Sequence, residues 1–162
     1  MYLLLTWLHV TFAGIWLVVF IADPLFKRYI SKAKNSKGEI ELISLYLKFV
    51  NLLGMIGAVG ILVTGIWMIL MDVGYGFFDF SGNHWLASKQ IIMVVILILL
   101  GWKLIPTAKK VRLLISEEIK SPVDDKSNVR ENLKKLYSVS FQINLLVIIN
   151  FLMAVTRILY IY

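Results

Sequence analysis

Four long apolar blocks constrain the fold of this chain more than any other feature of its sequence. They cover about residues 2–21, 46–71, 85–105 and 141–162. Each block is long enough to cross a hydrocarbon core of about 30 Å, which takes about 20 residues of α-helix. The pattern predicts an all-α integral membrane four-helix bundle, with residues 1–162 forming a single transmembrane domain.

Length and composition agree with this prediction. A chain of 162 residues has room for one bundle and no separate soluble domain. Hydrophobic residues make up 59% of the chain and charged residues 17%, against about 45–50% and about 25% in a typical soluble domain. The chain contains no cysteine, which excludes disulfides, thiolate metal sites and a cysteine nucleophile.

The basic residues are unevenly placed. The formal net charge is +7, and of the 17 Lys and Arg all but Lys89 and Arg157 lie in or beside two loops, residues 27–44 and 106–140. An excess of Lys and Arg marks cytoplasmic loops. We therefore expect a multi-pass protein of a bacterial inner membrane with both termini outside (N-out/C-out). The charge then reflects orientation in a lipid bilayer, and we expect no nucleic-acid partner.

The ends of the helices are also marked in the sequence. Asp23-Pro24 predicts the end of the first helix. Residues 107–120 keep a helical pattern, so we expect the third helix to project beyond the membrane and to stop at Ser121-Pro122. Asn128, followed by Glu131, matches a capping box, which predicts that a new helix starts there and runs into the fourth span.

Three ionisable side chains within the spans carry the strongest functional signal: His9, Lys89 and Arg157. Such a group at the centre of a membrane helix costs ~2.5–3.5 kcal/mol, so it is a functional candidate by default. At about 1.5 Å per residue, His9 lies ~10 Å, Lys89 ~6 Å and Arg157 ~7 Å below the outer surface. Three different helices thus place basic side chains in the same outer leaflet.

Helical spacing groups these three residues with others. On the first helix, Thr6, Phe12, Ala13, Trp16 and Phe20 share a face with His9, and on the second helix Gly57, Ile61, Thr64 and Met68 line up. On the third helix Met93 and Ile96 lie on the face of Lys89, and on the fourth helix Asn150 and Met153 lie on the face of Arg157. The small residues of the second helix allow close approach of another helix or a flat ligand. If these faces turn inward, the bundle encloses a slot open to the outside.

Each of these residues also has a structural interpretation. Lys89 and Arg157 lie near helix ends, from which their side chains can snorkel to the headgroups. A backbone carbonyl or a threonine can satisfy a buried His9, and Asn150 can hydrogen-bond between helices. His84 lies in the outer loop, where a solvated histidine is the default. The glycines of the second span are most simply packing residues.

Two cations beside a membrane histidine suggest a ligand that carries a metal and carboxylates, and haem b fits this description. His9 Nε2 can ligate the iron, while Lys89 and Arg157 can pair with the propionates. The predicted cofactor-binding residues are His9, Lys89, Arg157, Thr64, Met68 and Trp16. The second axial position of the iron could be filled by His84 or Met68. It could also be filled by Lys89 or stay open.

Two other functions remain open. One is copper handling or transport, with His9 and Met68, Met71 or Met93 as soft ligands. The other is a non-catalytic accessory subunit of a larger membrane complex, whose polar residues would be interhelical or lipid-facing. Two histidines and no cysteine argue against a dinuclear copper or zinc site.

Three segments resemble the HemJ-type protoporphyrinogen oxidases and related four-helix membrane proteins, including the CopD copper-resistance proteins. They are residues 5–10 (LTWLHV) with 14–16 (GIW), residues 63–67 (VTGIW), and residues 85–89 (WLASK). The resemblance implies a haem-b-binding bundle with His9 as a ligand and Lys89 near the cofactor. For HemJ itself it implies oxidation of protoporphyrinogen IX, with electrons passed to the respiratory chain.

The sequence departs from the HemJ pattern at three places. That family has a histidine late in its third helix, where this chain has residues 100–102 (LGW). It also has a histidine after the Trp-Leu pair, where this chain has Ala87, and an arginine before the second helix, where this chain has at best Lys48.

The leading hypothesis is a haem-b-binding membrane redox protein with its site in the outer leaflet. It would pass electrons between an outer substrate or partner and the quinone pool or a membrane respiratory complex. Such a protein would be a haem-dependent oxidoreductase or an electron carrier. We expect it to form homo- or hetero-oligomers.

Overall fold

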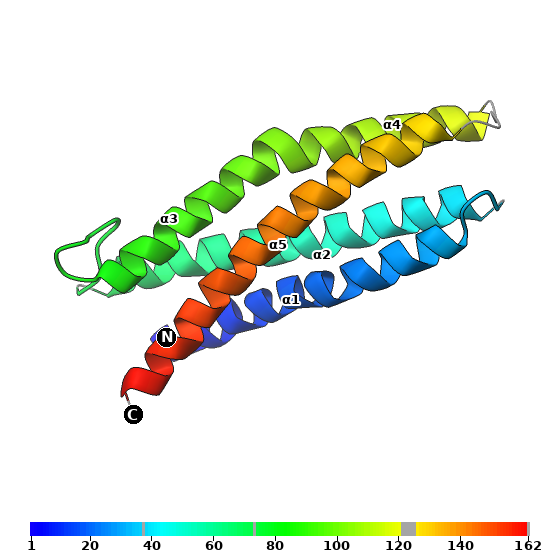
Figure 1. Ribbon diagram of the computed structural model, residues 1–162. Helices are drawn as coiled ribbons and strands as arrows, with labels where there is room; N and C mark the ends of the chain where they lie inside the picture. The colour runs from blue at the N-terminus through cyan, green and yellow to red at the C-terminus, as the bar shows by residue number, and fades with distance from the viewer. Residues whose placement is uncertain (37, 73, 121–125, 162) are drawn as a thin grey trace. The chain divides into compact units, whose positions relative to one another are not determined.

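The computed structural model describes residues 1–36, 38–72, 74–120 and 126–161, with side chains as far as residue 156. Its elements are α1 (Tyr2–Lys32), α2 (Glu39–Met71), α3 (His84–Leu99), the π-helical turn η1 (Leu100–Leu104), α4 (Ile105–Lys120) and α5 (Ser127–Ile161) (Figure 1). No strand occurs in these described ranges. The all-α class is therefore confirmed.

Four helical segments are long and apolar enough to cross a membrane. They are Tyr2–Lys32, Glu39–Met71, His84–Lys120 and Ser127–Thr156. In each segment, at most 17% of the residues in the most apolar stretch are buried inside the chain. Most of their apolar side chains therefore need a non-aqueous surrounding, which a lipid bilayer supplies. These features are those of a multi-pass membrane protein and confirm the predicted set of four apolar helices.

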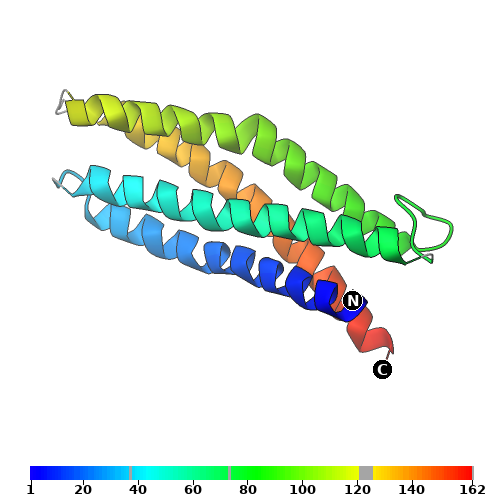
Figure 2. The ribbon, with the colours of Figure 1, turned by 180° about the vertical axis from the view of Figure 1, so that it is seen from behind.

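The chain divides into two compact units, Met1–Ser88 and Lys89–Tyr162. In the first unit, α1 and α2 lie side by side along their length (Figures 1 and 2). Gly57 and Gly60 of α2 make this close approach possible. A Cβ atom added at Gly57 would lie 3.2 Å from Cβ of Trp16, and one added at Gly60 would overlap the ring of Phe12. The glycines therefore have the packing role expected from their sequence.

Helix α1 does not end at Asp23 and Pro24, where the sequence pattern placed its end. It continues through Pro24 to Lys32, so part of the predicted 27–44 loop is helical, as is its end from Glu39. Proline removes only one N–H donor from a helix, and a helix that leaves the bilayer can continue in water. The span and the helix therefore end at different residues.

The charge of Asp23 is satisfied where α1 and α2 leave their apolar stretches. The Asp23 side chain is 4% exposed and Tyr46 is fully buried. The Tyr46 hydroxyl donates to Asp23 Oδ1 at 2.5 Å, and Lys27 Nζ donates to Oδ2 at 2.5 Å. The ring of Phe26 packs against that of Tyr46, with centroids 5.6 Å apart. This cluster links the two helices through a buried, fully partnered carboxylate.

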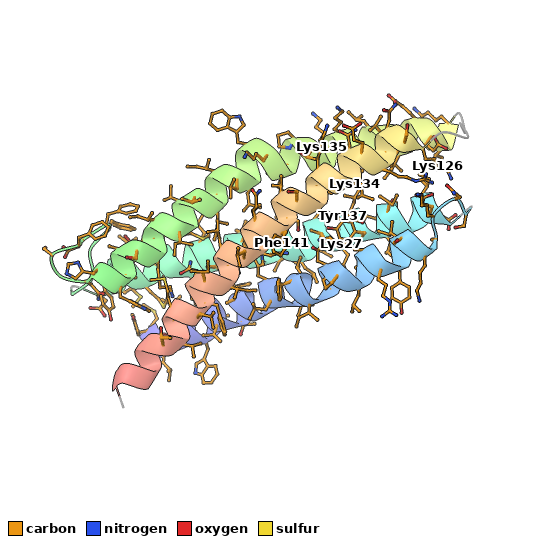
Figure 3. All side chains as sticks on the ribbon, in the orientation of Figure 1. Lys27, Lys126, Lys134, Lys135, Tyr137 and Phe141 are labelled. Atoms are coloured by element: carbon orange, nitrogen blue, oxygen red, sulfur yellow. The ribbon has the colours of Figure 1, made fainter. Side chains whose placement is uncertain are left out.

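In the second unit, α4 and η1 pack against α5. The buried side chains of this contact region are Val111 and Ile115 of α4 and Val129, Leu133 and Leu136 of α5. The prediction of a helix over 107–120 is confirmed, because α4 ends at Lys120. Ser121 and Pro122, the predicted stop, lie outside the described residues. Lys126 directly precedes α5, and Lys134 and Lys135 lie in its first half (Figure 3).

The predicted capping box is wrong. Helix α5 begins at Ser127, and Arg130 N–H donates to the carbonyl of Lys126, so Asn128 already lies inside the helix. Glu131 instead accepts from Lys135 Nζ at 2.7 Å. This pair is one helical turn apart, a spacing that favours oppositely charged side chains.

The π-helical turn η1 was not foreseen from the sequence. Ile105 N–H donates to the carbonyl of Leu100, five residues earlier. Pro106 has no N–H for the carbonyl of Trp102 and its ring would clash there in a regular α-helix. Widening the turn relieves this clash, so Pro106 accounts for the irregularity.

Candidate functional site

His9 lies on α1 facing α2, where its ring meets Thr64. His9 Nδ1 and Thr64 Oγ1 are 2.8 Å apart. Thr64 Oγ1 in turn donates to the carbonyl of Gly60 at 2.6 Å. A hydroxyl has one proton, and the carbonyl oxygen of Gly60 has none to give. We assign the threonine proton to the Gly60 carbonyl, so that the threonine oxygen accepts from Nδ1–H of His9. In neutral His9 this arrangement leaves the ring lone pair on Nε2.

The fold holds the His9 ring against the backbone of α2. A Cβ atom added at Gly65 would lie 3.3 Å from Cε1 of His9, tighter than most real contacts. Thr64 is 5% exposed, so water competes little for its hydroxyl. A ring held by a fixed hydrogen bond at Nδ1 is the arrangement that histidine metal ligands use, with Nε2 toward the metal. The residues present fit a histidine ligand.

Met68 and Trp16 lie on the same α1–α2 contact, on either side of the His9–Thr64 pair. The sulfur of Met68 is 3.8 Å from Oγ1 of Thr6, which lies one turn before His9. Trp16 is 3% exposed and packs beside Gly57 two turns further along α1. Four of the six predicted cofactor-binding residues therefore occupy one helix–helix contact.

The structure does not test whether Lys89 and Arg157 lie near His9. Lys89 is the first residue of the second unit and is half-buried on α3. The side chain of Arg157 lies outside the described residues. His84 is exposed at the start of α3. The grouping of three cations at one depth therefore stays a prediction.

Asn150 on α5 differs from its predicted role. Its Oδ1 is buried, and within the described part of the chain it has no hydrogen-bond partner. The predicted interhelical hydrogen bond is thus not made by this atom in the described ranges. An unsatisfied amide oxygen in an apolar helix is costly.

Metal-ligand types do not cluster in the described residues. No three His, Cys, Asp or Glu side chains come close enough there to hold a metal ion. Both metal hypotheses need only one imidazole from this chain. Haem b brings its own four nitrogen ligands, and a soft copper ion also accepts thioether sulfur.

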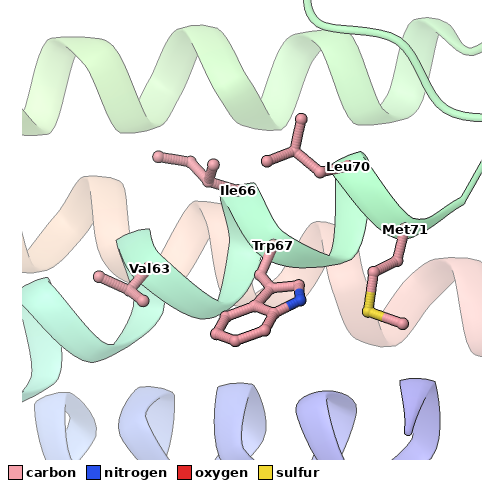
Figure 4. A pocket seen from close by; sticks show the side chains of 5 residues that line it. All are labelled: Val63, Ile66, Trp67, Leu70 and Met71. Atoms are coloured by element: carbon pink, nitrogen blue, oxygen red, sulfur yellow. The ribbon is translucent and has the colours of Figure 1, made fainter.

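A shallow apolar depression of about 490 Å³ lies on α2. Five residues line it: Val63, Ile66, Trp67, Leu70 and Met71 (Figure 4). Its lining does not include His9, Thr64 or Gly65. Its residues are largely exposed, Leu70 the most at 72%.

Asp23 and Tyr46 form the buried polar contact that sequence reasoning missed. A signal was present, because Asp23 is an acid next to the first apolar block with Lys27 one helical turn later. The tyrosine partner lies 23 residues away on another helix. Only the packing of α2 against α1 reveals it.

Comparison of the chain with protein-family models, curated proteins and solved structures gave no match. The resemblance of its short motifs to HemJ-type and CopD-like proteins therefore stays an expectation.

Proposed function

We propose that this chain is a haem-b-binding membrane redox protein in which His9 Nε2 ligates the iron. The observation that supports this proposal best is the chain of contacts from His9 Nδ1 through the Thr64 hydroxyl to the Gly60 carbonyl. Such a chain selects the tautomer whose lone pair lies on Nε2. The same contact would also satisfy a histidine that only joins two helices, so visible spectra of the purified protein decide between the two roles.

The other residues have roles that follow from their chemistry. Thr64 orients the ring, and Gly65 leaves space for it. Lys89 and Arg157 are the cations we assign to the propionates or to an anionic substrate. Bound haem b would supply a one-electron couple. Electrons would pass from an outer-leaflet substrate such as a porphyrinogen, or from a partner, to the quinone pool or a respiratory complex of a bacterial inner membrane.

The two histidines of the chain provide a matched test. We would record oxidised and dithionite-reduced visible spectra of the detergent-purified protein, made with ample haem, for the wild type, His9→Ala and His84→Ala. His84 is exposed at the start of α3, so its loss controls for removing any histidine. We expect a Soret band and reduced α and β bands in the wild type and in His84→Ala, and their loss in His9→Ala.

Other outcomes would change the assignment. Loss of the bands in both variants would make His84 the second axial ligand. Retention of the full spectrum in His9→Ala would exclude His9 as the ligand. A colourless wild-type protein that co-purifies with a larger membrane complex would favour the accessory-subunit function.

Copper handling is the second candidate because of Met68. Its sulfur lies on the same α1–α2 contact as His9, one helical turn beyond Thr64. Imidazole and thioether are ligands that copper accepts, Cu(I) especially. Metal analysis of the same samples separates the two functions: copper without a haem spectrum, lost in both His9→Ala and Met68→Leu, would favour copper.

A further inference from the structure

The loop between α2 and α3, residues 72–83, carries an exposed aromatic group. Phe77 is 51% exposed, Phe78 49% and Phe80 45%. The loop contains no Lys or Arg. A group of exposed aromatic rings in water is unfavourable and marks a surface that meets something apolar.

The carboxylate of Asp79 organises the loop from inside. Its Oδ1 accepts hydrogen bonds from Ser81 N–H at 3.0 Å, the Ser81 hydroxyl at 2.7 Å and Gly82 N–H at 3.0 Å. Asp72 Oδ1 does the same for Gly74 N–H at 3.0 Å. The loop therefore satisfies several of its own backbone donors through exposed Asx-type turns.

Two glycines allow the loop to close around this carboxylate. A Cβ atom added at Gly82 would lie 2.7 Å from Asp79 Oδ2, and one added at Gly76 would lie 3.0 Å from Asp79 Cβ. No side chain fits at either place without a shift. The Asp79 carboxylate thus holds the turn closed while staying accessible to solvent, and the three phenylalanine rings are exposed on the same loop.

Exposed apolar side chains also occur on the last turns of α2, directly before this loop. Leu70 is 72% exposed and Trp67 51% exposed, and both line the apolar depression (Figure 4). Met71 is the last residue of a helix long and apolar enough to cross the membrane. The exposed rings therefore follow within a few residues of the end of an apolar helix.

We propose that this loop is a membrane anchor, which inserts Phe77, Phe78 and Phe80 into the lipid surface where α2 ends and α3 begins. A short loop joining two membrane helices stays close to the bilayer, where aromatic side chains are favoured at the headgroup level. The anchor fixes the depth of both helix ends. It requires neither haem nor any role of His9.

Because the chain has no cysteine, single spin labels can test the anchor directly. We would label Phe77→Cys, Phe78→Cys and Phe80→Cys, one at a time, in phosphatidylcholine vesicles. His84→Cys is the matched control, because His84 is an exposed polar residue that directly follows the loop and whose side chain is not one of the hydrogen-bonding groups described above. The measurement is the accessibility of each label to oxygen, which concentrates in lipid, and to a water-soluble nickel complex.

We expect labels at 77, 78 and 80 to favour oxygen over nickel several-fold more than the label at 84. A folded protein whose four labels are equally accessible to nickel would overturn the proposal. If the three labels favour nickel in vesicles and lose that accessibility only in native membranes, a protein partner covers the loop instead of lipid. Circular dichroism of each labelled variant checks that its helices are intact.

Discussion

At the scale of single residues, His9 and Thr64 form the contact on which the proposed chemistry depends. The proton of the Thr64 hydroxyl is directed at Gly60, so the threonine acts as an acceptor toward the ring. A threonine at an exposed helix position would have water as an alternative partner. Because Thr64 is buried, water is a poor alternative partner for its hydroxyl, and the hydrogen bond between Thr64 and His9 favours one tautomer of the ring.

Thr64 can be tested without any cofactor. In a His84→Ala background the only histidine signal comes from His9, and ¹⁵N chemical shifts show which ring nitrogen carries the proton. We expect Nδ1–H in this background and with Thr64→Ser, and a shift of the population toward Nε2–H with Thr64→Val. A ring already in the Nε2–H form before Thr64 is changed would contradict the proposed contact.

If haem binds, the same variants separate an orienting role from simple packing. Valine keeps the volume of threonine but not its hydroxyl. Loss of a partner that orients a metal ligand typically costs 10–100-fold in affinity. We therefore expect Thr64→Val to weaken haem binding by about 10–100-fold and Thr64→Ser to have a much smaller effect.

Asp79 makes the outer loop sensitive to acid. Hydrogen bonds from the Ser81 side chain, and then from the backbone of Gly82, lower the pKa of the Asp79 carboxyl below its ordinary value. A depressed pKa adds stability above the ordinary carboxyl range, and that stability is lost as the pH falls through the lowered pKa. We expect a spin label at position 80 to stay ordered at pH values above the ordinary carboxyl range and to become mobile as the pH falls below that range. Asp79→Asn should remove this pH dependence.

At the scale of secondary-structure elements, α1 and α2 are joined by different interactions along their length. Gly57 and Gly60 allow close packing in the middle, and Asp23 with Tyr46 links the helices near the end of α1. Without a hydrophobic force between helices in lipid, packing and interhelical hydrogen bonds carry the association. The buried carboxylate of Asp23 is therefore part of what holds this pair in register.

The Tyr46 hydroxyl can be removed with little change in shape. We expect Tyr46→Phe to destabilise the protein by about 1.5–3 kcal/mol, because a buried charged group loses one of its partners. Tyr29→Phe is the matched control, since Tyr29 is on the same helix pair but 61% exposed. Unfolding in detergent should distinguish the variants, and equal stability of the two would show that the Tyr46–Asp23 contact contributes little.

At the scale of the whole molecule, the sequence predicted more of the architecture than of the site. The four apolar helices follow from the lengths of the apolar blocks, because a bilayer demands continuous apolar helix. Their ends were predicted less well. Hydropathy indicates where the apolar part of a helix ends, but the helix itself can extend further into water. Thus α1 continues past Pro24, and α5 begins before Asn128.

The sequence alone determined the helical class, the number of apolar helices, and the grouping of His9 with Trp16 on one face of α1 and of Thr64 with Met68 on one face of α2. These follow from local spacing, which needs no knowledge of neighbours. Tertiary structure decided that Thr64 meets Nδ1 of His9 and that Tyr46 meets Asp23. Both contacts join residues far apart in the chain, and their geometry depends on how closely α1 and α2 pack. The distance between α1 and α2 depends on the glycine positions and the side-chain shapes together, and a periodic sequence pattern does not contain this information.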